Sequence, residues 1–217
     1  MTPVGWVKQT FNGSDRAGRL LSIALLFAGV AFVLWTSLTR ELPDLRQRAV
    51  IVAIFVPLGL LLFPAGRLWG RLLDAVLMVG SVSGAVYVYV NYWDFMLRPS
   101  SSTALEAALG LIVAVTFLEL ARRCIGWSFA ALALFFFAWL FVGQFVQGRM
   151  GHAPISWQLL ADLMFRSTDG VWSGLIGLFS SLLAMFTLLS ALMTRTEVGQ
   201  TFIDLAMLVG GRFKGGA

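Results

Sequence analysis

The chain has 217 residues, of which 59% are hydrophobic and 12% are charged, and its mean hydropathy is +0.84. Soluble domains carry about 25% charged residues, so this composition excludes an ordinary soluble protein and indicates a chain embedded in lipid. The net charge of +5 comes from cations scattered between apolar runs, a pattern typical of membrane-topology signals and not of nucleic-acid binding.

The residues that most enzymes need are scarce. Cys124 is the single cysteine and His152 the single histidine, which excludes an internal disulfide and argues against a His/Cys metal site. The sequence has no Gly-rich phosphate loop and no plausible Ser/His/Asp grouping. We therefore expect no enzyme, no cofactor, and no catalytic or metal-binding residues. The first apolar run lacks a signal-peptide cleavage pattern and is expected to be a retained helix.

Six apolar stretches are long enough to cross a bilayer as helices, which takes roughly 20 residues. In chain order they are 20–38, 49–65, 72–93, 104–121, 127–146 and 170–193. Their continuous apolar character favours helices over alternating barrel strands. The predicted fold class is all-α: a polytopic membrane protein with six transmembrane helices. Pro57 should kink the second of them.

The connections carry structural signals of their own. Only residues 122–126 separate spans four and five, which predicts a tight antiparallel hairpin. The connection 147–169 is longer, and Ser156 in it is expected to cap a short surface helix over 157–167. Residues 99–103 are expected to form a turn.

The chain finishes on a segment with a different pattern. Glu197, Gln200, Thr201 and Asp204 fall on one helical face, with apolar residues filling most of the gaps. This spacing predicts an amphipathic arm helix lying at the membrane interface, followed by a glycine-rich turn.

Lysines and arginines predict the orientation. If the N-terminus is cytoplasmic, ten of the sixteen cations lie on the cytoplasmic side, so both termini are expected there. Five tryptophans fall at or near span ends and are expected to anchor the helices at the headgroup boundary: Trp35, Trp69, Trp93, Trp127 and Trp172.

Charged groups near the spans can be coupling residues or members of simple ion pairs. Asp74 lies three residues after Arg71, and an i, i+3 pair explains it without a role in transport. Glu119 lies three and four residues before Arg122 and Arg123, which predicts a pair at the end of the helix. We favour the structural interpretation for both acids over a coupling role.

Other polar or small positions have structural interpretations as well. Glu106 suits the positive end of span four. Asn91 and Gln144 are each either interfacial or bonded to a neighbouring helix. The segments 80–84 (GSVSG) and 170–174 (GVWSG) are expected to be small-residue faces for close helix packing.

Four stretches, 42–66, 85–94, 118–143 and 155–217, together resemble the fused membrane component of tripartite ATP-independent periplasmic (TRAP) transporters. The last is the most specific, because TDG at 168–170, FIDLA at 202–206 and GRFKGG at 211–216 come in the family's order. The sequence is therefore similar to the N-terminal portion of such a permease.

The resemblance implies two domains. Residues 1–124 would form a small-subunit-like four-helix membrane domain. Residues 125–217 would begin the large-subunit-like domain, with two spans, an outer-face short helix and the arm helix, ending before the transport domain. Substrate-binding residues would then lie downstream, with none in this chain.

The resemblance also implies a mechanism: sodium-coupled uptake of organic acids in the bacterial inner membrane by an elevator, with this chain as scaffold and inactive alone. The implied partners are the remainder of the large permease subunit, a periplasmic substrate-binding protein and the lipid bilayer, without nucleic acid. Helix 157–167 is either a docking element for the binding protein or, as we favour, a loop helix on the surface. The alternative function is a non-transporting membrane assembly or adaptor protein.

Overall fold

The computed structural model describes residues 16–39, 42–66, 68–98, 102–146, 151–196 and 198–210. All of the regular structure in these residues is helical, in this chain order: α2 (Arg16–Thr39), α3 (Asp44–Leu62), α4 (Leu68–Val90), α5 (Tyr92–Leu97), α6 (Ala104–Cys124), α7 (Trp127–Val142), η1 (Gly143–Phe145), α8 (Trp157–Ala161), η2 (Asp162–Arg166), α9 (Gly174–Leu178), η3 (Phe179–Leu183), α10 (Ala184–Arg195) and α11 (Val198–Gly210). The expected all-α fold class is confirmed.

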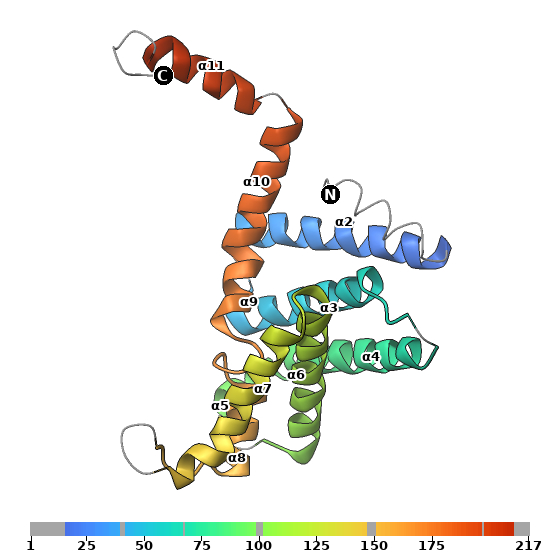
Figure 1. Ribbon diagram of the computed structural model, residues 1–217, viewed down its shortest axis with the longest axis vertical. Helices are drawn as coiled ribbons and strands as arrows, with labels where there is room; N and C mark the ends of the chain where they lie inside the picture. Colours follow the sequence, from blue (N-terminus) through green and yellow to red (C-terminus); the bar gives the residue numbers. More distant parts are fainter. Residues whose placement is uncertain are drawn as a thin grey trace.

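Six helices in the described ranges are long and apolar enough to cross a membrane, as predicted. The sixth is continuous in space but is built from α9, the π-helical turn η3 and α10. The second, α3, continues through Pro57 to Leu62 as one helix. In Figure 1, α2, α3 and α4 run across the view one above another, while α6, α7 and the α9–α10 helix cross them steeply.

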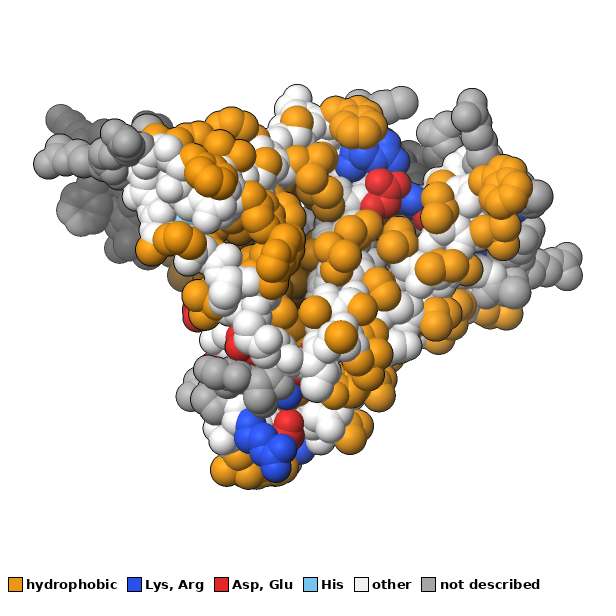
Figure 2. Space-filling view, turned by 90° about the horizontal axis from the view of Figure 1, so that it is seen from below, with side chains coloured by type: hydrophobic (Ala, Val, Ile, Leu, Met, Phe, Trp, Pro, Cys, Tyr) orange, Lys and Arg blue, Asp and Glu red, His pale blue; other side chains and the backbone are white. Residues whose placement is uncertain are grey.

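Helix α3 lies at the centre of the fold. Five of its apolar residues recur at helical spacing along one face and are buried in the main core: Leu45, Ala49, Val52, Val56 and Leu60. In its most apolar 18-residue stretch 44% of residues are buried, against 6% for the last span. The α9–α10 helix therefore lies at the periphery, with most of its apolar side chains available to lipid. Figure 2 shows how apolar side chains cover most of one face.

The short connection between spans four and five forms the predicted hairpin. Helix α6 ends at Cys124 and α7 begins at Trp127, so that only Ile125 and Gly126 connect them. Gly126 has φ of 114°, a left-handed conformation that glycine adopts without steric penalty. The reversal of direction between the two helices therefore depends on this residue.

The small residues at 80–84 allow α4 to approach α6 closely. A Cβ atom at Gly80 would lie 2.5 Å from Cγ2 of Ile112, and one at Gly84 would lie 3.0 Å from Cγ2 of Val113. Ser81 between them is fully buried. The predicted packing face at 80–84 is confirmed.

Two predictions at the start of the last span are wrong. Residues 170–172 belong to a turn, and α9 begins only at Gly174, where an added Cβ atom would have no neighbouring heavy atom within 4 Å. The 170–174 segment is therefore not a helix-packing face. Trp172 is fully buried and does not lie at a lipid boundary. Its indole N–H is satisfied inside the protein, where it donates to the Phe165 carbonyl oxygen at 2.8 Å. The other four tryptophans that were predicted as anchors, Trp35, Trp69, Trp93 and Trp127, are exposed.

The C-terminal segment forms the expected helix, α11, which turns away from α10 at the upper end of Figure 1. Its described side chains from 200 to 208 are exposed, including Gln200, Thr201 and Asp204. Glu197 and the glycine turn at 211–217 lie outside the described residues, as does most of the predicted turn at 99–103.

Candidate functional site

A buried arginine joins the first and second halves of the chain. Arg166, from the π-helical turn η2, is 6% exposed. Its guanidinium forms a bidentate ion pair with the carboxylate of Glu106 in α6. Arg166 Nε lies 2.9 Å from Glu106 Oε2, and Nη2 lies 2.9 Å from Oε1. Such paired, charge-assisted hydrogen bonds are strong and fix orientation. We call this group, with Asp94 and Tyr87, the η2 clamp.

The remaining members of the η2 clamp come from α4 and α5. Asp94 Oδ2 lies 3.4 Å from Arg166 Nη2, and Tyr87 donates its hydroxyl to Glu106 Oε1 at 3.1 Å. Arg166 Nη1 donates to the Arg98 carbonyl oxygen at 2.5 Å, and the guanidinium carbon lies 4.7 Å from the ring centre of Phe95. Arg166 therefore connects η2 directly to α5 and α6, and through Glu106 to Tyr87 of α4.

Local sequence explains how Glu106 is positioned. Thr103 and Glu106 form a capping box: the Thr103 hydroxyl accepts from Glu106 N, and Glu106 Oε2 accepts from Thr103 N at 2.8 Å. The predicted place of Glu106 at the positive helix end is confirmed, but it is also the counter-ion of a buried cation. Hydrogen bonding to Glu106 raises the pKa of Arg166 above its ordinary value, so the guanidinium stays charged.

Asp162 strengthens the same connection one turn earlier. Its Oδ1 accepts from Ser102 N at 2.9 Å, and Gln158 of α8 donates to the Ser102 carbonyl oxygen at 3.1 Å. Ser156 caps α8 by accepting from Leu159 N at 3.2 Å, as predicted. The surface helix is thus held against the start of α6 and does not project freely.

A second ionic cluster lies at the other end of α4 and α6. Arg123 donates to Asp74 Oδ1 at 2.5 Å, to Glu119 Oε1 at 2.8 Å and to the Phe63 carbonyl oxygen at 2.8 Å. Glu119 also accepts from Arg122 at 2.6 and 2.7 Å. The predicted Glu119 pairs are confirmed.

The predicted partner of Asp74 is wrong. Its side chain is paired with Arg123 of α6, and its second oxygen accepts from Ala65 N at 2.9 Å. Arg71, on the same helix three residues earlier, is exposed instead. The tertiary partner is favoured because it lies in the protein interior, where the side chain of Arg123 is 9% exposed and the ion pair is poorly screened.

The two amides make local interactions. Asn91 donates to the Tyr87 carbonyl oxygen at 2.9 Å, one turn earlier in the chain, and Gln144 donates to the Phe141 carbonyl oxygen at 3.0 Å. Neither bond crosses to a neighbouring span. Among the described residues, no group of three or more His, Cys, Asp or Glu side chains is arranged to hold a metal ion.

A polar cavity that the sequence analysis missed lies between α2, α3 and α9–η3, with a volume of about 760 Å³. Arg48 and Gln47 line it from α3. Arg48 Nη1 donates to the Trp172 carbonyl oxygen at 2.8 Å, and Gln47 donates to Ser180 Oγ at 3.3 Å. These bonds span 124 and 133 residues. No local spacing rule predicts them, although two polar residues in the first turns of an apolar span were an available signal.

Comparison with known proteins bears on the second half of the chain. Residues 112–217 match the family model described as tripartite ATP-independent periplasmic transporter, DctM component. No curated protein and no solved structure gave a significant match. The matched part begins inside α6 and includes α7, η2 and everything after it, so it holds Arg166 and Arg123. The family is one of transporters and not of enzymes. Over residues 112–217, just under half of its length, the chain is therefore similar to the DctM component of TRAP transporters.

Proposed function

We propose that the chain is the stationary scaffold of a sodium-coupled TRAP permease that takes up organic acids delivered by a periplasmic binding protein. In this proposal residues 1–124 are the small-subunit-like part and residues 125–217 begin the large-subunit-like part. The mobile transport domain, with the sodium and substrate sites, belongs to the remainder of the large permease subunit. The chain alone is then inactive.

The η2 clamp is the observation that carries the proposal. It fastens η2, from the DctM-like segment, to the start of α6 and to α4 and α5. A buried ion pair loses its solvation on formation and is strongly destabilised if either partner leaves, so the joined elements move as one body. An elevator needs such a rigid frame, against which a separate domain slides.

The rigidity of the frame can be tested by cross-linking. Gln158 donates to the Ser102 carbonyl oxygen, so cysteines at these two positions are within reach of a short reducible linker. The experiment uses Ser102→Cys/Gln158→Cys with Cys124→Ser, assembled with the rest of the permease and its binding protein in proteoliposomes.

We expect sodium-driven uptake to be the same before and after linking, because the linked elements do not move relative to each other. The matched control is the same protein after reduction of the linker. Loss of uptake on linking, restored by reduction, would show that these elements move and would reject the scaffold assignment. Sodium-driven uptake by this chain alone would reject the proposal that the sodium and substrate sites belong to the remainder of the large permease subunit.

Orientation has a separate test in the native protein. Cys124 is exposed at the end of α6, beside Arg123, and is the single cysteine of the chain. With both termini cytoplasmic, it faces the cytoplasm. We expect a membrane-impermeant maleimide to label it in inverted inner-membrane vesicles and not in intact spheroplasts. The reverse labelling pattern would overturn the predicted orientation.

A further inference from the structure

The cavity between α2, α3 and α9–η3 lies where three membrane helices have their ends. It is lined by Thr36 and Ser37 from the last turn of α2, by Asp44 and Arg48 from the first turns of α3, and by Gly174 at the start of α9. Since each of these helices crosses the membrane, their ends lie at one membrane boundary, at the depth of lipid head groups.

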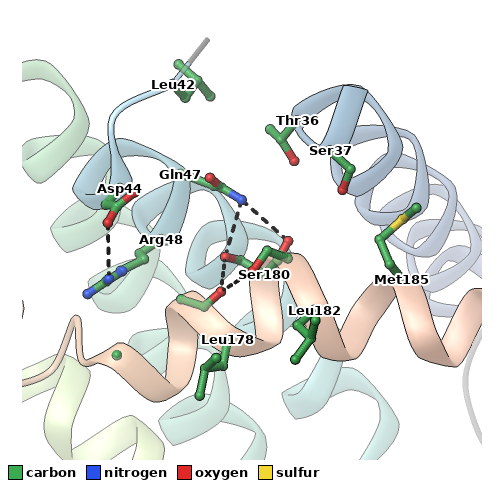
Figure 3. A pocket seen from close by; sticks show the side chains of 13 residues that line it. Thr36, Ser37, Leu42, Asp44, Gln47, Arg48, Leu178, Ser180, Leu182 and Met185 are labelled. Carbon is green, nitrogen blue, oxygen red and sulfur yellow. Dashed lines mark hydrogen bonds and ion pairs between the residues drawn. The ribbon is translucent and has the colours of Figure 1, made fainter. Parts of the chain in front are cut away.

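The lining is part polar and part apolar. Most of its polar groups belong to the ends of α2 and α3, with Ser180 and Ser181 of η3 facing them, while Leu178, Leu182 and Met185 are apolar residues of the α9–η3–α10 wall. These three side chains are 37–52% exposed and supply an apolar part of the lining. Figure 3 shows Asp44 and Arg48 on one side of the cavity and Met185 on the other. A ligand that fits this lining has a polar head and an apolar tail.

The charges specify the head group further. Arg48 Nη1 donates a hydrogen bond to the Trp172 carbonyl oxygen. Arg48 Nη2 lies 3.6 Å from Asp44 Oδ2, which is too far for a hydrogen bond. Arg48 Nε is buried without a hydrogen-bond partner among the described residues, an unfavourable state for a charged group. The Nε–Nη2 edge of a guanidinium has the fork geometry that suits a phosphate.

The carboxylate beside it is free to act separately. The side chain of Asp44 is 83% exposed and its ion pair with Arg48 is long. The cavity therefore places the Arg48 guanidinium, whose Nε is buried next to Gly177, beside one accessible anion. A zwitterionic ligand satisfies both, with a phosphate on Arg48 and an ammonium group on Asp44.

From these observations we propose that this cavity binds a phospholipid whose head group carries a phosphodiester and a primary ammonium, as phosphatidylethanolamine does. The phosphate bonds to Arg48, the ammonium donates to Asp44, and an acyl chain contacts Leu178, Leu182 and Met185. The lipid would connect α2 and α3 to the peripheral last span. The site is independent of transport, so its test does not depend on the proposed function.

The test uses native mass spectrometry of the delipidated full chain, with phosphatidylethanolamine, phosphatidylglycerol or phosphatidylcholine added at equal concentration. Phosphatidylglycerol lacks the ammonium group, and phosphatidylcholine has no N–H to donate. We expect phosphatidylethanolamine to be retained roughly tenfold better than either, the scale of one charged hydrogen bond. Soluble glycerophosphoethanolamine, which lacks the tail, should not displace it.

Two variants assign the contacts. Asp44→Asn should abolish the preference for phosphatidylethanolamine over phosphatidylglycerol, and Arg48→Gln should weaken retention of all three lipids. Arg122→Gln, a change at another helix end, is the matched control and should leave retention unchanged. Should Arg48→Gln fail to fold, the exposed Asp44→Asn decides alone. Equal retention of the three lipids by the unmodified chain, an unchanged preference in Asp44→Asn, or displacement by the soluble head group would each overturn the proposal.

Discussion

The η2 clamp predicts a specific pattern of stability in single and double variants. Arg166→Met would leave the carboxylate of Glu106, 1% exposed, with only the neutral donors Tyr87 and Thr103. Glu106→Met would leave the buried guanidinium with Asp94 at 3.4 Å as its nearest remaining carboxylate. Removing one partner of a buried ion pair costs about 3–5 kcal/mol, because the other charge remains buried and uncompensated.

The double variant, Glu106→Met/Arg166→Met, removes both charges at once. Replacing a buried pair by apolar side chains of similar size is often close to neutral. We therefore expect the double variant to be more stable than either single variant, even though Thr103 N and the Tyr87 hydroxyl lose an acceptor. The coupling in the double-mutant cycle should be several kcal/mol, on the scale of the single losses of about 3–5 kcal/mol.

Thermal unfolding in detergent, followed by tryptophan fluorescence at one fixed scan rate, measures this pattern. Trp172 is fully buried and bonded to Phe165, the neighbour of Arg166, so its emission reports on the clamp. With about 2–4 °C per kcal/mol for a chain of this size, each single variant should lower Tm by about 6–20 °C. Asp169→Asn, an exposed carboxylate nearby, is the control and should change Tm little.

Either of two results would refute a buried, coupled ion pair. One is a single variant whose Tm is within error of the Asp169→Asn control, which would mean that the ion pair is solvated or absent. The other is a double variant whose loss equals the sum of the two single losses, which would mean that Glu106 and Arg166 act independently.

Two further predictions concern the packing of α4 on α6. Arg123→Gln should destabilise by about 3–5 kcal/mol, because its buried side chain pairs with two carboxylates. Arg122→Gln should lower Tm far less, because the Arg122–Glu119 pair is more exposed to solvent. Comparable Tm losses in the two variants would contradict this prediction. Gly80→Ala should cost about 1–3 kcal/mol through its contact with Ile112, while Gly174→Ala, which meets no atom within 4 Å, should be near neutral. Adding Gly80→Ala to Ile112→Ala should bring no further loss in the same assay; an additive loss would place the clash elsewhere.

Local patterns in the amino-acid sequence were enough to predict the elements themselves. The six spans follow from runs of apolar residues long enough to cross a bilayer. The Ser156 cap and the Glu119 pair were predictable because capping and i, i+3 or i, i+4 contacts join residues within one turn of a helix. The hairpin between α6 and α7 was predictable for the same reason, since its connection is too short for any other arrangement.

Which helix ends meet could be seen only in the folded chain. Glu106 and Arg166 are 60 residues apart, Asp74 and Arg123 are 49 apart, and Arg48 reaches the backbone of Trp172 across 124 residues. A helix-spacing rule assigned Asp74 to Arg71, and a boundary rule placed Trp172 in contact with lipid. Both rules failed for the same reason: in a low-dielectric interior, charged and polar groups take the partner that packing places beside them, and packing is a property of the assembled helices.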